Sequence, residues 1–413
     1  MLLKSKAYNL LRKTQKYTRT DNVYLFKSGF WLTLPKAVSF LSILSGIAFA
    51  NLVSKETYGT YQYILSILGI LSIATLQSMK TAVAQAVARG YEGSVKKAVV
   101  SKIKWGLLGS VGSILFSAYY FYHGNATLGW AFVITAALLP FLNPFSLYAA
   151  YLEGSKNFKL LSIFSILSTA VSIAAIIVIL FITDNVLLII LGDLLVGIIV
   201  AFAFFNIVIK KFPPNAKEDP KTIPFGTRVS LIKIIPTIAR ELDQIIIWHF
   251  LGAAQVAIYA FAQKIPTQLS DNLSVLNQLA FPKMSAASSD DLKKNLPKKI
   301  IRLYAMIIPL GIAYILSVPF VFKIFFPQYL DSILYAQIFS FFIFFFPLSF
   351  ISQTFDAKMQ EKNILITSIF SPTLRIILLL ILTPTIGVMG VVLTRLINSF
   401  ATNLLAIFLF LKK

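Results

Sequence analysis

Five basic side chains lie inside stretches of the chain that are otherwise apolar: Lys36, Arg240, Lys264, Arg375 and Arg395. An ionised side chain in the middle of a bilayer costs at least about 2.5–3.5 kcal/mol even on the most lenient insertion scale, so it should face protein or water. Arginine also offers forked N–H donors that suit phosphate oxygens. The set therefore predicts a cavity that binds an anion.

The depth of these residues separates a role in a cavity from the reach of a long side chain to the membrane surface. Arg240 and Arg375 lie about a dozen residues from the basic ends of their apolar stretches, or about 18 Å along a helix at about 1.5 Å per residue. A side chain cannot cover that distance to reach water. For these two the alternative is a structural ion pair. Lys36, Lys264 and Arg395 lie closer to an end, so a position at the membrane surface remains their alternative.

Four acidic side chains share the apolar stretches: Asp193, Glu241, Asp243 and Asp271. Three interpretations of these acids stay open, namely structural pairing, coupling to protons or sodium ions, and direct contact with a sugar. Pairing is suggested by Arg240 and Asp243, which are three residues apart on a helix. Lys264 and Asp271 share a helix face seven residues apart. Because the basic groups outnumber the acidic ones, the predicted cavity is cationic.

Polar side chains recur at helical spacing beside these charges. At about 100° per residue, the polar residues of each stretch fall on one helix face. The predicted polar lining consists of Thr237, Gln244, Gln268 and Asn398. One polar stripe on an apolar helix can join two helices, whereas several such helices with basic residues among them are more typical of a water-filled cavity.

The elements that must position these groups are membrane-spanning helices. Apolar residues make up 57% of the chain and charged residues only 13%, against about 25% charged in a soluble domain. About twelve stretches approach or exceed the roughly 20 residues that cross a bilayer. They cover residues 28–50, 58–79, 99–122, 127–150, 160–182, 186–209, 228–251, 255–280, 301–325, 332–355, 364–384 and 386–411. The sequence predicts an all-α polytopic membrane protein.

The basic residues fix the expected orientation. Of the 38 lysines and arginines, 31 fall in the two ends of the chain and in alternate connections, and the opposite connections hold only Lys55 and Lys323. By the positive-inside rule, this distribution places both termini in the cytoplasm. It also accounts for the net charge of +22, so a nucleic-acid partner is not expected. We expect a multi-pass protein of the cytoplasmic membrane.

The longest connection divides the twelve stretches into six and six. It is rich in proline and charge and reads KKFPPNAKEDPKTIPFGTR, which is typical of a linker. A weak repeat supports two halves, since Tyr61 and Tyr259 occupy matching places in NLVSKETYGTYQY and HFLGAAQVAIYAFAQ. An even number of spans makes the repeats parallel. The expected organisation is a cytoplasmic tail (1–27), a first lobe (28–209), a linker (210–227) and a second lobe (228–413).

Several kinds of chemistry are excluded by residues that the chain lacks. There is no cysteine, which rules out disulfides and thiolate metal sites. No phosphate-binding loop and no cluster with metal-ligand spacing occurs, and the connections opposite the basic ones are too short to form a catalytic domain. The sequence therefore indicates no enzyme and no cofactor, although a coupling ion, H⁺ or Na⁺, remains open.

Three segments resemble a known family. Residues 241–266 read ELDQIIIWHFLGAAQVAIYAFAQKIP, and residues 46–71 read GIAFANLVSKETYGTYQYILSILGIL. Together with GVMGVVLTRLINSF at 387–400, they are similar to Wzx-type polysaccharide flippases, of the superfamily that includes multidrug exporters. The resemblance implies two six-helix lobes in a V, with spans 1, 2, 7 and 8 around a central cavity. It places Lys36, Arg240, Asp243 and Lys264 on the lining helices, whereas Arg375 and Arg395 rest on depth alone.

The expected function is transport of a lipid-linked glycan. A flippase of this kind would move oligosaccharides on a polyprenyl pyrophosphate carrier across the cytoplasmic membrane, by alternating access, for surface polysaccharide such as O-antigen. Its expected partners are the bilayer and the glycolipid, and it would act as a monomer, alone or with polysaccharide assembly proteins. The alternatives are an ion-coupled multidrug or solute exporter of the same superfamily and, in another class, a polytopic glycan polymerase or ligase.

Overall fold

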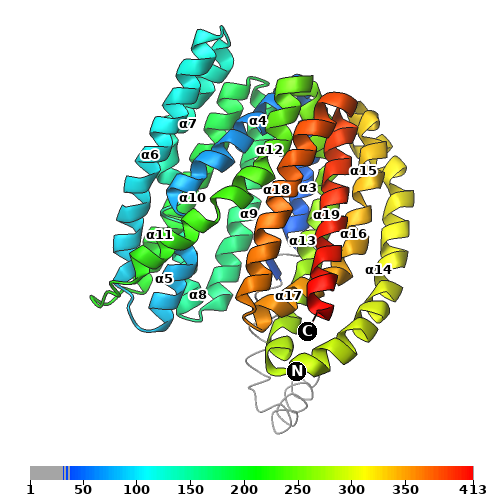
Figure 1. Ribbon diagram of the computed structural model, residues 1–413. Coiled ribbons are helices and arrows are strands. Elements are labelled where there is room, and N and C mark those ends of the chain that lie inside the picture. Colours follow the sequence, from blue (N-terminus) through cyan, green and yellow to red (C-terminus); the bar gives the residue numbers. More distant parts are fainter. Residues whose placement is uncertain (1–30, 32–33, 36–37, 413) are drawn as a thin grey trace, which may run out of the picture.

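Helices joined by short connections make up the structure. The computed structural model describes residues 31, 34–35 and 38–412, and within these ranges it contains helices and no strand (Figure 1). The predicted site residue Lys36 lies outside the described residues.

The first half of the chain forms one bundle of helices. Its elements are η1 (Ser39–Leu41), α3 (Ser42–Leu52), α4 (Lys55–Leu71), η2 (Ser72–Thr75), α5 (Met79–Ala88), α6 (Ser94–Tyr122), α7 (Ala126–Leu142), α8 (Leu147–Gly154), α9 (Phe158–Ile182) and α10 (Val186–Lys211). Side chains in the short connections cap the helices that follow. The Ser54 hydroxyl, for example, accepts from the Thr57 amide at 3.1 Å, and Asn125 accepts from Leu128 at 3.0 Å. Such caps let a turn of a few residues start a new helix.

The second half forms the other bundle. Its elements are α11 (Thr222–Ile232), α12 (Ile234–Leu251), α13 (Ala253–Ala286), α14 (Ser289–Phe325), η3 (Pro327–Ser332), α15 (Ile333–Phe339), α16 (Phe341–Phe345), η4 (Phe346–Leu348), α17 (Ser349–Ala357), α18 (Glu361–Ile386) and α19 (Val388–Leu411). Gly252 and Gly387 have φ of +85° and +63°, a conformation that L side chains rarely adopt. They form the tight turns α12–α13 and α18–α19.

The helices agree with the predicted spans. Eight segments of the described chain are long and apolar enough to cross a membrane, or nine with the bent pair α4–α5. The other predicted spans coincide with the short helix Ser39–Leu52, with the pair α11–α12, and with α13, which carries charged residues. The second predicted stretch differs in shape, because it breaks at residues 72–78 and continues as α5 after a bend of 42°.

A buried lysine stabilises this break. Leu76 has a φ of +52°, and its carbonyl accepts from the Met79 amide at 3.0 Å. The ammonium of Lys102, on α6, donates to that carbonyl at 3.1 Å, and Lys102 is only 2% exposed. From the sequence, Lys102 counts among the basic residues around the connection 80–104, with no buried partner expected. The structure instead buries its ammonium beside the break in α4–α5.

The two bundles meet along α4, which packs against both α12 and α13. At Gly59 the backbones touch, since a Cβ there would lie 1.8 Å from the Ala253 carbonyl oxygen. Aromatic side chains continue the contact, with the Tyr58 and Phe261 ring centroids 4.6 Å apart and those of Tyr63 and Trp248 4.5 Å apart. The helix ends near residues 53–54 and 252 are therefore closely joined.

The connection between the bundles is bound to the first one. Arg89 pairs with Asp219 at 2.5 Å, Lys97 pairs with Glu218, and the Gly93 amide donates to the Lys217 carbonyl at 2.9 Å. Helix α11 then packs on α5. Only Lys233 separates α11 from α12.

Candidate anion-binding site

A buried carboxylate, Asp243 on α12, organises the charges of the second bundle. It is 1% exposed and accepts from Arg375 on α18, at 2.6 Å from Nη2 and 3.2 Å from Nε. Arg395, on α19, forms a second ion pair with it at 3.0 Å. The Tyr259 hydroxyl of α13 also donates to this carboxylate. Four helices thus converge on one acidic group.

The cluster keeps a positive charge after this pairing. Two guanidinium groups face one carboxylate, and arginine does not lose its proton in proteins. Each guanidinium has a further acceptor: Arg375 donates to the Arg240 carbonyl at 3.4 Å, and Arg395 donates to Gln263 Oε1 at 2.7 Å. Those acceptors are neutral, so one formal positive charge remains.

A cavity of about 340 Å³ adjoins both arginines. Its polar lining includes Ser371, Asn398 and Thr402. The Asn398 amide donates to Ser371 at 3.0 Å, while Asn398 Oδ1 and Thr402 Oγ1 are buried with no hydrogen-bond partner in the described chain. Because buried polar atoms normally find partners, the Thr402 hydroxyl can donate to an anionic or polar ligand, and Asn398 Oδ1 can accept from a ligand hydroxyl.

Lys264 lies apart from this cluster, on the face of α13 that meets the first bundle. Its Nζ approaches Gly46 of α3 so closely that a Cβ there would lie 2.6 Å away, and it sits 5.9 Å from the Phe261 ring centroid. Lys264 forms no ion pair with any described residue. Because Gly46 has no side chain, it leaves room for the Lys264 ammonium between the bundles.

Arg240 does not pair with Asp243, the partner that helical spacing suggests. Arg240 pairs with its neighbour Glu241 at 2.8 Å, not with Asp243, and 57% of its side chain is exposed. The reason is tertiary: Arg375 and Arg395 reach Asp243 from neighbouring helices and occupy its oxygens. Arg240 is therefore near the candidate site but does not line the cavity beside the two other arginines.

The remaining predicted residues make separate contacts in the two bundles. Gln268 and Gln244 join the bundles, since Gln268 donates to Ser39 at 2.7 Å and Gln244 accepts from Ser66 at 2.9 Å. Thr237 is buried on α12. Asp193 of α10 accepts from the Tyr61 hydroxyl at 2.8 Å and forms no ion pair with the residues that the structure describes.

Comparison with known proteins assigns the chain to a family. A sequence model of polysaccharide biosynthesis proteins matches residues 48–334. The chain belongs to this family. No curated protein matches the chain by sequence.

Solved structures give the fold of this family member. It is similar to an inward-facing multidrug resistance MATE family transporter of the MOP superfamily, with a TM-score of 0.65, 14% identity, and coverage of 92% of this chain and 97% of that one. The corresponding values for an outward-facing MATE family transporter are 0.58, 14%, 93% and 94%. For a MOP superfamily transporter from Pyrococcus furiosus, described by a binding pocket of reverse polarity, they are 0.60, 14%, 93% and 95%.

These matches establish the architecture. The chain is a multi-pass membrane protein with the two six-helix lobes of the MATE fold. The first bundle is hereafter the N-lobe and the second the C-lobe.

Sequence reasoning missed the hydroxyl of Tyr259 as a hydrogen-bond donor to Asp243. The match between Tyr61 and Tyr259 was a signal for it, since each donates to a carboxylate in its own lobe.

Proposed function

We propose that this polysaccharide biosynthesis protein is a flippase for oligosaccharides linked to a polyprenyl pyrophosphate carrier. The observation that carries the proposal is the positive charge left on the cluster of Arg375, Arg395 and Asp243, next to a cavity with unpartnered polar atoms. A diphosphate would bind the arginines, and the hydroxyl and amide groups would contact sugar or phosphate oxygens. Lys264, between the lobes, supplies a second positive charge for the same anion.

The proposed orientation places both termini in the cytoplasm. It is supported by the basic connections, which lie at the end of the molecule that also holds the C-terminus (Figure 1). In this orientation the membrane potential assists export, because moving an anion outward through 100 mV yields about 2.3 kcal/mol per charge. Alternating access would require opening of the contact between α4 and the pair α12–α13.

An ion-coupled multidrug exporter is the second candidate. It is favoured by Asp193, a carboxylate in the N-lobe with a hydroxyl partner and no cationic partner in the described chain. The polarity of the C-lobe cavity opposes it, since two arginines there outnumber one aspartate. A cationic drug would be repelled from such a cavity.

Proteoliposomes containing the purified chain can separate the two candidates. The first assay measures translocation of a polyprenyl-pyrophosphate-linked oligosaccharide, and the second measures uptake of a cationic dye under a proton or sodium gradient. A flippase moves the glycolipid and not the dye. The reverse result would establish the exporter and refute the proposal.

Substitutions then test the site. Lys264→Gln and Arg395→Gln should each weaken glycolipid binding about 10- to 100-fold, the equivalent of losing a charged hydrogen bond of about 1.5–3 kcal/mol. Lys323→Gln, with the same charge change at the end of α14, is the matched control. If both site variants restore surface polysaccharide in a flippase-deleted strain as well as the control does, at equal protein levels, the proposed docking groups are wrong.

A further inference from the structure

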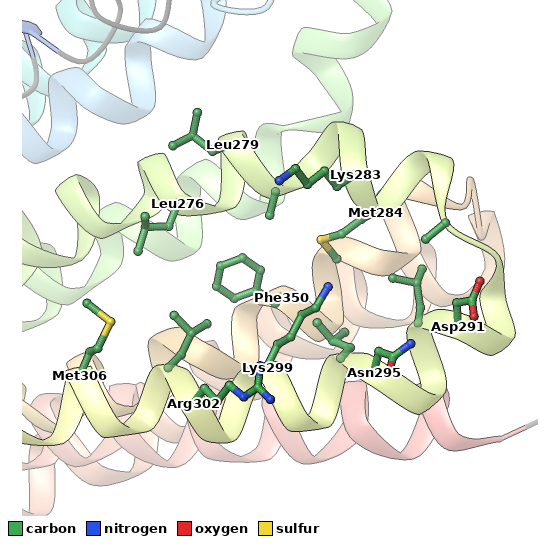
Figure 2. A pocket seen from close by; sticks show the side chains of 15 residues that line it. Leu276, Leu279, Lys283, Met284, Asp291, Asn295, Lys299, Arg302, Met306 and Phe350 are labelled. Carbon is green, nitrogen blue, oxygen red and sulfur yellow. The ribbon is translucent and has the colours of Figure 1, made fainter. Parts of the chain in front are cut away.

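A second hollow lies between the end of α13 and the start of α14, away from the site described above. Its volume is about 570 Å³, and Phe350 of α17 lies at its base (Figure 2). None of its lining residues belongs to the cavity beside Arg375 and Arg395. On α13 it begins at Leu276, about 18 Å along the helix from Lys264 at about 1.5 Å per residue. We call it the α13–α14 groove.

Three basic side chains border the α13–α14 groove. Figure 2 shows Lys283 on α13 and Lys299 and Arg302 on α14, on opposite sides of the hollow. All three are exposed, and none forms an ion pair with a described residue. Asp291 also lines the groove, near the α13–α14 turn, where its carboxylate accepts from the Ser288 hydroxyl at 2.9 Å. Three cations against one held carboxylate leave a local excess of positive charge.

Apart from Asn295, the remaining lining is apolar and extends along α13 and α14 away from the turn between them. Leu276 and Leu279 on α13 lie opposite Met306 on α14 (Figure 2). Leu279 is 59% exposed and Met306 is 72% exposed. Because α14 is long and apolar enough to cross a membrane, exposed apolar side chains on its side of the groove would contact acyl chains. Methionine adapts its shape to irregular partners.

The order of polar and apolar groups along the groove is that of an anionic lipid. We propose that the α13–α14 groove binds an anionic glycerophospholipid of the leaflet on the side of the basic connections, as a resident lipid and not as cargo. Its phosphate would contact Lys283, Lys299 and Arg302, and an acyl chain would lie along Leu279 and Met306. Charge complementarity selects an anionic headgroup, and basic pockets between membrane helices are suited to such headgroups.

The site lies where a bound lipid could influence the C-lobe. It connects α13, which meets the N-lobe along α4, with α14 and α17. A lipid bridging α13 and α14 therefore holds together two helices that are linked at this end only by residues 287–288. The proposal is independent of what the transporter carries.

Native mass spectrometry of the full chain, purified in a mild detergent, tests the proposal. The probes are phosphatidylglycerol, phosphatidylcholine, glycerol phosphate and a polyprenyl diphosphate. A variant combining Lys283→Gln, Lys299→Gln and Arg302→Gln is compared with one combining Lys293→Gln, Lys294→Gln and Lys298→Gln, which removes the same charge from α14 outside the groove. Since each basic residue near a membrane surface contributes about fivefold to anionic-lipid binding, the groove variant should bind phosphatidylglycerol on the order of 100-fold more weakly.

The expected result is tight phosphatidylglycerol binding in the wild type and in the control variant, loss in the groove variant, and weak binding of phosphatidylcholine and glycerol phosphate. Equal loss in both variants would reduce the effect to general surface charge and overturn the proposal. Preferential binding of polyprenyl diphosphate would make the groove a carrier site and also overturn it. If the groove variant does not elute as a folded monomer, Leu279→Asn with Met306→Asn provides a second test, and its unchanged lipid binding would refute the acyl-chain placement.

Discussion

Removing the carboxylate of Asp243 should destabilise the C-lobe more than removing either arginine that pairs with it. The Asp243→Asn variant leaves two guanidinium groups side by side without the carboxylate that neutralises one of them. Breaking a buried ion pair by removing one partner costs about 3–5 kcal/mol. Removing one arginine leaves the carboxylate paired with the other and with Tyr259. That loss should cost about 1.5–3 kcal/mol, the value of a charged hydrogen bond.

The geometry also orders the two arginines. Arg375 makes two hydrogen bonds to Asp243, whereas Arg395 contacts it at one distance of 3.0 Å. The expected order of destabilisation is therefore Asp243→Asn, then Arg375→Gln, then Arg395→Gln. Arg240→Gln is the control, because its side chain is mostly exposed and paired with Glu241, and surface pairs contribute about 0–1 kcal/mol.

The measurement is the free energy of unfolding in mixed micelles, with Trp fluorescence as the readout. A double variant, Asp243→Asn with Arg395→Gln, adds a test of coupling: it should be less destabilised than the sum of its two single variants, since neutralising one arginine relieves the repulsion left by the other change. If Asp243→Asn is no less stable than Arg240→Gln, or if the two changes are additive, the carboxylate does not neutralise the pair and the reasoning fails.

Two further predictions concern the contact between α4 and α13 and the buried hydrogen bond of Lys102. Gly59→Ala should separate α4 from α13 and reduce transport, because its Cβ would meet the Ala253 carbonyl; Gly197→Ala, where nothing lies within 4 Å of a Cβ, should keep full transport in the same proteoliposomes, and equal activity of the two variants would contradict a tight contact at Gly59. Lys102→Met should lower the free energy of unfolding by about 1.5–3 kcal/mol through loss of a charged hydrogen bond. The exposed Lys104→Met is its control, and a matching small effect at both positions would show that the ammonium does not stabilise the helix break.

The sequence predicted the fold well because the long apolar stretches of membrane helices can be recognised along the chain. Apolar length, basic connections and the charged linker gave the helices and their division into lobes, which the structural matches confirm. Polar connections such as that at Ser54 could be recognised in the same way, since a cap acts within three residues. These features depend on neighbours along the chain.

The charge partners depend instead on neighbours in space. Helical spacing suggested Asp243 for Arg240, yet residues 132 and 152 positions further along the chain occupy that carboxylate. No pattern along the chain indicates that α18 and α19 bring their arginines to α12. The buried partner of Lys102 was missed for a related reason, because its acceptor, the Leu76 carbonyl, lies at the break in α4–α5. The charged residues could be singled out from the sequence, while their pairing required the tertiary structure.

The proline-rich connection has a consequence for how the halves can be defined. Its contacts through Arg89, Lys97 and Gly93 attach it to the N-lobe. Helix α11, although it belongs to the second half of the chain, packs on α5 of the same lobe. A rigid-body rotation of one lobe against the other must then bend the chain at Lys233, the single residue between α11 and α12. The border between the moving halves then lies at Lys233, five residues beyond the predicted start of the second lobe at residue 228. A peptide tag inserted at residues 213–217 would accordingly report on the N-lobe alone.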